Sequence, residues 1–232
     1  MTKLGVITGL KFEADIIRRA VQSLKHEHPL YASVAGNQER SYEAAKDFVA
    51  GGAKALISFG IAGGLTDDVP VGTLILASEV YCGKGGVYKT DKVWREGLEG
   101  VLKSEISAVS GPVISLPYAL ETEAQKRQAH IDTGAYGVDM ESFGVARAAK
   151  EMKVPFIVIR AVSDGAADTL PACVVPAMGP EGDIKLGPVL KGIAGKPGDI
   201  PELIGFGLKT RKANATLRRV SFLGLPLFGF GG

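Results

Sequence analysis

The stretch Pro155–Ser163, with the sequence PFIVIRAVS, is the most apolar strand-like run in the chain. A run of this kind is typical of a strand that is buried on both faces of a sheet. We therefore expect it to form the central strand of a sheet that helices cover on both sides. The run is followed by Asp164, which places a carboxyl group at the carboxyl end of the expected central strand.

Short apolar runs alternate with amphipathic runs on both sides of this strand, which predicts an α/β fold. The other expected strands are residues 4–8, 30–35, 55–61, 73–81, 112–116 and 136–140. The expected helices are residues 12–24, 42–50, 92–103, 121–130, 142–152, 187–194 and 200–219. The rest of the Gly- and Pro-rich segment 165–199 is expected to consist of loops.

The bulk composition favours a single domain. The chain has 232 residues, of which 46% are hydrophobic, and this suits one large α/β domain with a sizeable core. Charged residues make up 22% and the net charge is only +2, so nothing in the bulk charge suggests a nucleic-acid partner. We assign residues 1–219 to this domain and residues 220–232 to an apolar tail.

Cysteine and histidine residues give no sign of a disulfide framework or a metal site. Cys82 and Cys173 are too few for such a framework in a chain of this length, and we expect both thiols to be reduced. His26, His28 and His130 do not cluster with cysteines or acids at ligand spacing. No run reaches the ~20 apolar residues of a membrane-spanning helix, and we see no signal peptide, so we expect a cytoplasmic protein.

Three acidic residues follow expected strands, namely Glu13, Glu141 and Asp164. Because ligands of α/β sheets bind at the carboxyl ends of the strands, these carboxyl groups could converge at one rim. Glu13 and Glu141 could instead be first-turn acids that the helix dipole favours, and Asp164 could cap a turn. A carboxyl group beside the low-dielectric core can also keep its proton, which would make Asp164 a general acid. Gly63 and Gly64 could form a backbone N–H pocket for an anion, or only a tight turn.

Four blocks of the sequence resemble one enzyme superfamily. The blocks SFGIAGGL (58–65), VDMES (138–142) and RAVSDGA (160–166) resemble the purine and uridine phosphorylase superfamily. The opening GVITGLKFEAD (5–15) is similar to that of the methylthioadenosine/S-adenosylhomocysteine nucleosidases. The resemblance implies a single-domain, three-layer α/β/α fold with a central mixed, partly barrel-like sheet. It also implies a homo-oligomeric enzyme that cleaves the N-glycosidic bond of a purine nucleoside without a cofactor.

The same resemblance implies roles for the three acids. Asp164 matches the acid that protonates the purine at N7 as it leaves, and Glu141 matches the carboxylate that binds the ribose hydroxyls. Glu13 matches the residue that positions the attacking water in the nucleosidases. Such groups suit a bond that breaks through an oxocarbenium-like sugar with a poor leaving group. The other implied substrate-binding residues are Ala62 and Gly63 beside the nucleophile, Met140 against sugar and base, Tyr118 on the base-stacking segment, and Ser163 next to Asp164.

The sequence does not decide whether the nucleophile is phosphate or water. Phosphorylases of this superfamily hold phosphate with arginines and a Ser or Thr, but Ser58 stands where one arginine would be and Ile61 where the hydroxyl is common. Glu13 lies near the expected phosphate position, and two like charges ~4 Å apart repel by ~4 kcal/mol at an effective dielectric constant of ~20. Phosphate as a co-substrate would need a compensating cation. Arg40 is the candidate, although it could also be an exposed loop residue.

The second half of the chain resembles a particular branch of the superfamily. The segments RAVSDGAADTLP (160–171) and ATLRRV (215–220), with the Gly- and Pro-rich stretch, resemble the hopanoid-associated phosphorylases, which release adenine from adenosylhopane. No acidic residue follows Glu202, and the chain ends on the apolar run VSFLGLPLFGFGG (220–232). This end could attach peripherally to the inner membrane or to a lipid-linked nucleoside, or pack on the body or on a neighbouring subunit.

Three other interpretations compete with this one. The first is a methylthioadenosine/S-adenosylhomocysteine nucleosidase. The second is a module of the same fold that binds or senses a nucleoside without cleaving it, since fold does not fix function. The third, a dinucleotide-binding domain, is disfavoured because no G-x-G-x-x-G follows the first expected strand.

Overall fold

The computed structural model describes residues 3–22, 29–83, 85–179, 182–224, 228 and 230. The strands in this part of the chain form one mixed sheet in the order β2-β1-β3-β7-β6-β4-β5, and β8 pairs with both β3 and β4. The strands are β1 (Leu4–Thr8), β2 (Leu30–Ser33), β3 (Ala55–Gly64), β4 (Leu74–Cys82), β5 (Val87–Lys89), β6 (Ala108–Ser115), β7 (Gly137–Asp139) and β8 (Phe156–Asp164).

Part of this sheet closes on itself. Strand β8 runs parallel to β3 and antiparallel to β4. Strand β3 also pairs with β7, β7 with β6, and β6 with β4, so these five strands form a closed circuit. Strands β1 and β2 extend the sheet from β3, and β5 extends it from β4. This confirms the predicted mixed, partly barrel-like sheet.

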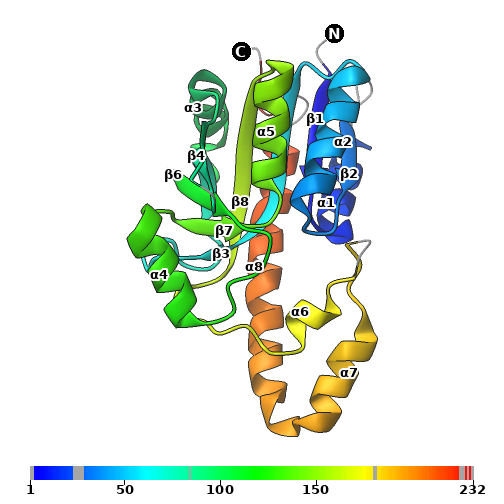
Figure 1. Cartoon of the computed structure of the whole chain (residues 1–232), viewed down its shortest axis with the longest axis vertical. Coiled ribbons are helices and arrows are strands. Elements are labelled where there is room, and N and C mark those ends of the chain that lie inside the picture. Colours follow the sequence, from blue (N-terminus) through cyan, green and yellow to red (C-terminus); the bar gives the residue numbers. More distant parts are fainter. Residues whose placement is uncertain are drawn as a thin grey trace.

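Helices cover both faces of the sheet, as predicted (Figure 1). Helices α2 and α5 pack against each other on one face, and α8 contacts both α1 and α3 on the other. Each face has its own apolar core, one built with α2 and α5 and the other with α1, α3 and α8. The helices are α1 (Lys11–Val21), α2 (Gln38–Ala50), α3 (Lys92–Leu102), α4 (Glu123–Thr133), α5 (Ser142–Met152), α6 (Val174–Ala177), α7 (Leu186–Gly195) and α8 (Ile200–Gly224).

The apolar run Pro155–Ser163 lies almost entirely in β8, the central strand of the sheet. Every residue of β8 is buried, and the strand has hydrogen-bonded neighbours on both sides. Ile157 and Ile159 contribute to the core on the α8 side, whereas Val158 and Val162 contribute to the core on the α5 side. Alternate side chains of an extended strand point to opposite faces, so a strand between two helical layers is apolar throughout.

The segment after β8 differs from the predicted loops. It contains α6 as well as α7, and a 3-10 helix over Pro197–Asp199 leads directly into α8. Helix α7 and the first part of α8 project from the body, and we call residues 186–208 the distal hairpin (Figure 1). Helix α8 also continues to Gly224, beyond its predicted end at residue 219.

Part of the C-terminal tail packs on the body. Val220 and Phe228 are buried, and the Trp94 indole Nε1 donates a hydrogen bond of 2.7 Å to the Phe228 carbonyl. The Phe228 ring lies 6.2 Å from that of Phe59, measured between centroids. Residues 225–227, 229, 231 and 232 lie outside the described part, as do His26 and His28 of the sequence analysis.

Three further observations concern the described residues alone. None of their helices is long and apolar enough to cross a membrane. No group of three His, Cys, Asp or Glu side chains among them is arranged to hold a metal ion. Cys82 and Cys173 are both free and partly buried.

Candidate active site

One cavity of about 410 Å³ lies at the carboxyl ends of the strands, and the three acids converge on it. Glu13 reaches it from the first turn of α1, Glu141 from the residue before α5, and Asp164 from the end of β8. The predicted residues Ala62, Gly63, Tyr118, Met140 and Ser163 also line it. Residues that are far apart in sequence thus share one pocket. The parallel strands β1, β3 and β8 bring their carboxyl ends to one edge, and β7 pairs antiparallel with the end of β3 at that edge.

Glu13 is buried in a cradle of backbone N–H groups. Its Oε2 accepts hydrogen bonds from Gly9 N at 2.9 Å and Leu10 N at 2.8 Å, and its Oε1 accepts one from Ile61 N at 2.8 Å. Burial raises the pKa of the Glu13 carboxyl, while Arg160 and these three N–H groups act in the opposite direction. A first-turn acid also suits the positive end of the helix dipole. Glu13 is therefore both a first-turn acid of α1 and a lining residue of the cavity.

Arg160 supplies the buried positive charge of the site. Its side chain is fully buried, and its Nε donates to Asp139 Oδ2 at 2.9 Å. Its Nη2 donates to Ser58 Oγ at 2.6 Å and to Glu141 Oε2 at 3.2 Å. Ser58 stands where the superfamily's phosphorylases have an arginine. In this structure Arg160, on the neighbouring strand β8, contacts Ser58. Ion pairs of this depth need several partners to offset the loss of hydration.

Asp139 fixes the orientation of this arginine. Burial alone would raise the pKa of its carboxyl, but Arg160 and the hydroxyl and N–H groups of Ser142 outweigh burial and lower it. Asp139 Oδ1 accepts from Glu141 N at 3.0 Å and from Ser142 N at 2.9 Å. Asp139 therefore holds both the arginine and the start of α5 in place.

Glu141 is the acid that the site perturbs most clearly. Burial raises its pKa to about 8; Arg160 opposes this shift, and the negative charges of Asp139 and Glu13 add to it. Its Oε1 faces Gly9, where a Cβ atom would lie only 2.4 Å from this oxygen, so no larger residue fits at position 9. Gly36, with a φ of +61°, lies on the same side and near Met140. Glu141 Oε1 therefore faces the cavity next to bare backbone.

Asp164 has a buried lysine as its partner. The Lys126 ammonium donates to Asp164 Oδ2 at 2.5 Å, and to the carbonyls of Gly165 and Asp168 at 3.0 and 2.8 Å. The Ser163 hydroxyl donates to Asp164 Oδ1 at 2.7 Å. The sequence predicted apolar surroundings for this carboxyl, whereas α4 brings the Lys126 ammonium into contact with it.

Two of the predicted residues lie at or beyond the margin of the cavity. Tyr118 lines it but is 57% exposed. Arg40 is exposed, lies within α2 rather than in a loop before it, and does not line the cavity. The cation next to Glu13 and Glu141 is Arg160 instead.

The remaining wall of the cavity is apolar. It is made by α6, the residues that flank it, and α8, through the side chains of Leu170, Val174, Val175, Met178 and Phe206. Phe206 belongs to the distal hairpin, and α6 lies between that hairpin and the sheet (Figure 1). The cavity therefore combines a buried ionic floor with a wall that suits an apolar group.

Sequence reasoning missed three residues of the site, namely Arg160, Asp139 and Lys126. The first two had a signal, because an arginine interrupts the most apolar strand and Asp139 belongs to the block VDMES. Lys126 had none, because it is one of several polar residues in α4 and its partner is 38 positions away.

Comparisons with known proteins identify the family and the fold. The family model of the phosphorylase superfamily matches residues 35–173, which is more than half of the chain. The chain belongs to the phosphorylase superfamily. Comparison with curated protein sequences gives no significant match.

Solved structures share the whole fold of this phosphorylase superfamily member at low sequence identity. The 5'-methylthioadenosine/S-adenosyl homocysteine nucleosidase of Helicobacter pylori aligns with a TM-score of 0.72 and 16% identity over 94% of this chain and 95% of that one. Futalosine hydrolase of Helicobacter pylori strain 26695 gives 0.70 and 15% over 95% and 97%. The 5'-methylthioadenosine/S-adenosylhomocysteine nucleosidase of Neisseria meningitidis gives 0.67 and 18% over 96% and 98%.

Proposed function

We propose that this protein cleaves the N-glycosidic bond of a purine nucleoside and releases adenine. The observation that carries the proposal is the convergence of Glu13, Glu141 and Asp164 on one cavity. Membership of the phosphorylase superfamily supports it, as do the nucleosidases among the structures that share the fold.

The sugar would bind over Glu141. Its Oε1 faces the cavity next to Gly9 and Gly36, where no side chain separates it from a ligand. A carboxyl group there can form hydrogen bonds to two adjacent ribose hydroxyls. The bond to the base breaks as the ring becomes oxocarbenium-like, and carboxylates close to the ring stabilise that charge.

The purine would bind at Asp164. The Ser163 hydroxyl and the Lys126 ammonium hold the two carboxyl oxygens in fixed positions, and Gly63 leaves room beside them. Protonation of the purine at N7 makes it a better leaving group. We propose that Asp164 acts as the general acid and passes a proton drawn from solvent to N7 as the bond breaks.

Water is the nucleophile that the geometry supports best. The backbone N–H groups of Gly9, Leu10 and Ile61 form a cradle that could hold an anion, but the Glu13 carboxyl already fills it. The guanidinium of Arg160 binds Asp139 through Nε and Glu141 through Nη2; its Nη1 has no hydrogen-bond partner among the described residues, but Arg160 does not line the cavity. Phosphorolysis, the alternative, would need a cation that the described lining residues do not supply.

The substituent at the 5′ position of the nucleoside would be apolar. The wall formed by α6 and α8 offers Leu170, Val174 and Met178 to the cavity. Together with the resemblance of the segment 160–171, this favours a lipid-linked nucleoside such as adenosylhopane. Methylthioadenosine is the alternative substrate. It is less favoured because its small 5′-methylthio group would leave part of this wall uncovered.

Product analysis tests both parts of the proposal. The protein is incubated with adenosylhopane, with methylthioadenosine and with adenosine, each with and without phosphate, and adenine and the sugar product are quantified by chromatography and mass spectrometry. We expect adenine from adenosylhopane at a rate that does not depend on phosphate. A sugar 1-phosphate that appears only with phosphate would contradict hydrolysis, and faster release from methylthioadenosine would contradict the lipid-linked substrate.

The variant Asp164→Asn separates an enzyme from a binding module. A carboxamide cannot donate the proton that the leaving purine needs, so release should fall by ~100-fold or more while nucleoside binding persists. Ser110→Asn, on the exposed part of β6, is the matched control and should leave release unchanged. If release of adenine by Asp164→Asn equalled that of the unmodified protein, the proposed role of Asp164 would be wrong.

A further inference from the structure

The distal hairpin carries large apolar side chains that contact water. Leu186 and Leu190 of α7 are 71% and 63% exposed, and Ile204 and Leu208 of α8 are each 59% exposed. Ile200, at the start of α8, is 38% exposed. We call these five residues the distal patch. Single exposed apolar residues are ordinary, but a group of them on one projection marks an interaction site.

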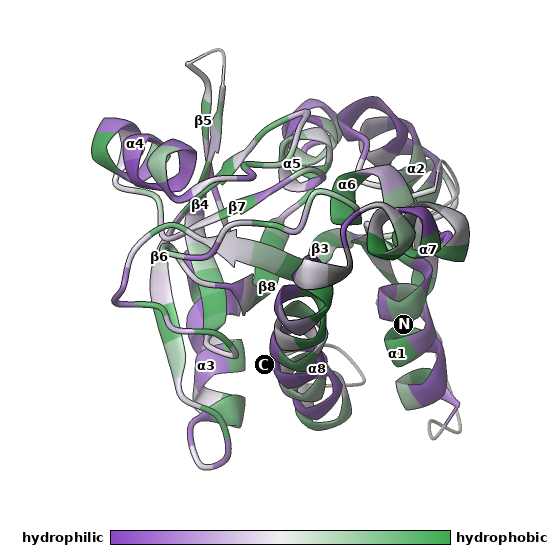
Figure 2. Cartoon of the chain, turned by 90° about the horizontal axis from the view of Figure 1, so that it is seen from below, coloured by the Kyte–Doolittle hydropathy of each residue, from purple (hydrophilic) through white to green (hydrophobic). Residues whose placement is uncertain are grey.

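The spacing of the distal patch gives each helix an apolar face. Leu186 and Leu190 are four residues apart on α7. Ile200, Ile204 and Leu208 follow the same four-residue interval along α8. Residues at this interval lie one above the other on a helix, so both arms carry a continuous apolar stripe. Figure 2 views the molecule from the hairpin's end and shows apolar residues along α7 and within α8.

The charges around the patch are mostly positive. Residues 182–212 hold the cations Lys185, Lys191, Lys196, Lys209, Arg211 and Lys212 and the acids Asp183, Asp199 and Glu202. Lys196 is paired with Asp199, and Lys209 with Asp168. Lys185, Lys191 and Arg211 are exposed near the two arms. Apolar helical faces flanked by lysine and arginine are typical of segments that lie in the interface of an anionic membrane.

The patch adjoins the entrance of the cavity. Phe206 lines the cavity from α8, while Ile204 and Leu208, two positions before and after it, lie on the opposite side of the same helix turn and are exposed. On the other arm, α7 packs against α6, whose Val174 and Val175 line the same cavity. The same two helical segments therefore carry the apolar wall of the cavity on one side and the distal patch on another. A hairpin seated in a bilayer would place the cavity at the level of the lipid headgroups.

We propose that the distal hairpin docks on an anionic membrane surface, with the distal patch inserted among the acyl chains. The patch supplies the apolar contact, and the surrounding lysine and arginine residues supply the attraction to anionic headgroups. The proposal places membrane contact at residues 186–208, whereas the sequence left the tail open between membrane attachment and packing on the body or on a neighbouring subunit. Docking itself does not depend on the proposed reaction, although it explains how a lipid-linked substrate would reach the site.

Vesicle cosedimentation without any nucleoside tests the docking. The full chain is mixed with vesicles of phosphatidylcholine alone, or of an equimolar mixture of phosphatidylcholine and phosphatidylglycerol. We expect strong binding to the anionic vesicles only. The variant Leu190→Glu/Ile204→Glu should bind at least tenfold more weakly, because two charges then enter the apolar layer. The control Val93→Glu/Ile131→Glu alters residues of α3 and α4 that are 77% and 75% exposed, and it should bind as the unmodified chain does.

Three results would overturn the docking. The unmodified chain could fail to bind anionic vesicles, or the hairpin variant could bind as well as the control. The hairpin variant could also lower the oligomeric state in solution without changing vesicle binding, which would make the distal patch a contact between copies of the chain. Thermal unfolding of both variants near that of the unmodified chain verifies that they fold. Failure of adenine release with intact vesicle binding would contradict the proposed reaction alone.

Discussion

Arg160 is an arginine in the middle of a buried strand, and it explains the ionisation of the residues around it. It is flanked by Asp139 and Glu141, with Glu13 nearby, so the buried cluster holds more acids than bases. With a single cation among them, the acids cannot all ionise without repulsion. Asp139 takes the closest contact and its pKa falls, whereas the pKa values of Glu13 and Glu141 rise. At the residue scale, the shortage of positive charge therefore favours the protonated forms of Glu13 and Glu141.

The raised pKa of Glu141 predicts a pH-dependent stability of the folded protein. The pKa of Glu141 is 4.5 in an unperturbed carboxyl and about 8 in the folded protein. A raised pKa means that folding favours the protonated form, so the stability that this group contributes is lost as the pH rises from about 4.5 to about 8. Glu141→Gln removes this loss. We expect the melting temperature of the variant, relative to the unmodified protein, to rise steadily between pH 5 and pH 8.

The control for this prediction is Glu43→Gln, which alters an exposed acid on α2. Its melting temperature should follow that of the unmodified protein at every pH. Parallel curves for Glu141→Gln and the unmodified protein would show that Glu141 ionises in the folded state as freely as in the unfolded state. The explanation of the cluster given above would then be wrong.

The sequence predicted those site residues that follow strands, since strand ends can be recognised locally. Glu13, Glu141 and Asp164 were found in this way, and the cavity brings them together. Arg160 and Lys126 were not found, because their roles depend on partners that only the folded chain brings close. A buried lysine on a polar helix has no local pattern that separates it from an exposed one.

At the scale of elements, the predicted strands and helices appear wherever apolar residues repeat at a regular interval. The departures lie where that interval is missing. The three-residue strand β5 and the four-residue helix α6 are too short to show a repeat, and neither was predicted. Helix α8 runs past its predicted end because Val220 and Ser221 still pack on the body. Tertiary contacts fix such boundaries, and the local sequence carries little information about them.

The contact between α2 and α5 depends on one glycine. A Cβ atom at Gly144 would lie 2.1 Å from the Gln38 carbonyl oxygen and 2.8 Å from Ser41 Cβ. Gly144→Ala must therefore push the two helices apart, and we expect it to lower the free energy of unfolding by about 1–3 kcal/mol in urea denaturation.

Gly100 in α3 is the matched control, because a Cβ atom there meets nothing within 4 Å. Gly100→Ala should raise the free energy of unfolding by about 0.5–1 kcal/mol, since alanine favours a helix more than glycine does. If both substitutions stabilise the protein, α2 and α5 are not in close contact at this point.

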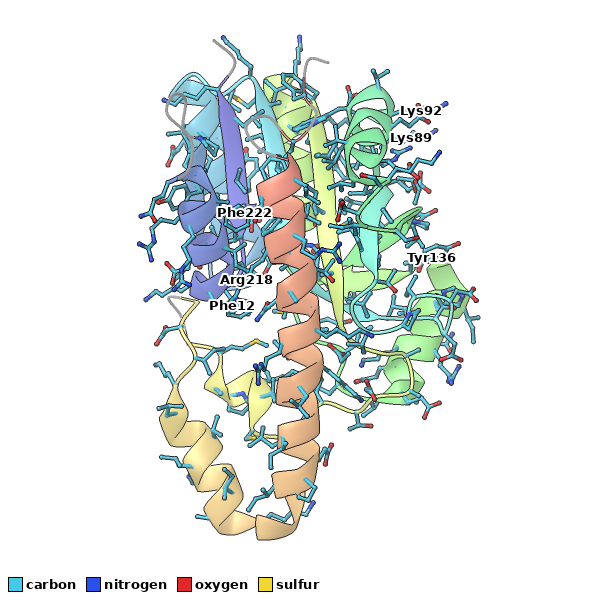
Figure 3. All side chains as sticks on the ribbon, turned by 180° about the vertical axis from the view of Figure 1, so that it is seen from behind. Phe12, Lys89, Lys92, Tyr136, Arg218 and Phe222 are labelled. Carbon is cyan, nitrogen blue, oxygen red and sulfur yellow. The ribbon has the colours of Figure 1, made fainter. Side chains whose placement is uncertain are left out.

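At the scale of the whole molecule, α8 joins two regions with different surroundings. Its 25 residues span roughly 37 Å, from the distal hairpin to the far end of the sheet. Its first part carries the exposed distal patch, and its second part packs on the core through Ala213 and Leu217. Figure 3 shows it running along the molecule, with Arg218 and Phe222 on the part beside the sheet.

The C-terminal tail, residues 220–232, should contribute to stability rather than to membrane contact. Phe228 is fully buried against Phe59, so Phe228→Ala should lower the free energy of unfolding by about 3–5 kcal/mol. Phe222→Ala, at a side chain that is 58% exposed, should change it by less than about 0.5 kcal/mol. Equal effects in urea denaturation, or vesicle binding that is lost with Phe228→Ala at intact stability, would contradict the packing of the tail.

The closed circuit of strands has a consequence for how the chain reaches its native state. The last strand, β8, pairs with β3 and β4, which precede it by about one hundred and about eighty residues. Long-range pairings of this kind form slowly, because the loop between the partners must be ordered first. During synthesis on the ribosome, the edges of β3 and β4 that pair with β8 therefore stay unpaired until β8 has been made. Arg160 and Asp164 arrive on this same strand, so the nascent chain acquires its ionic centre only when the circuit closes.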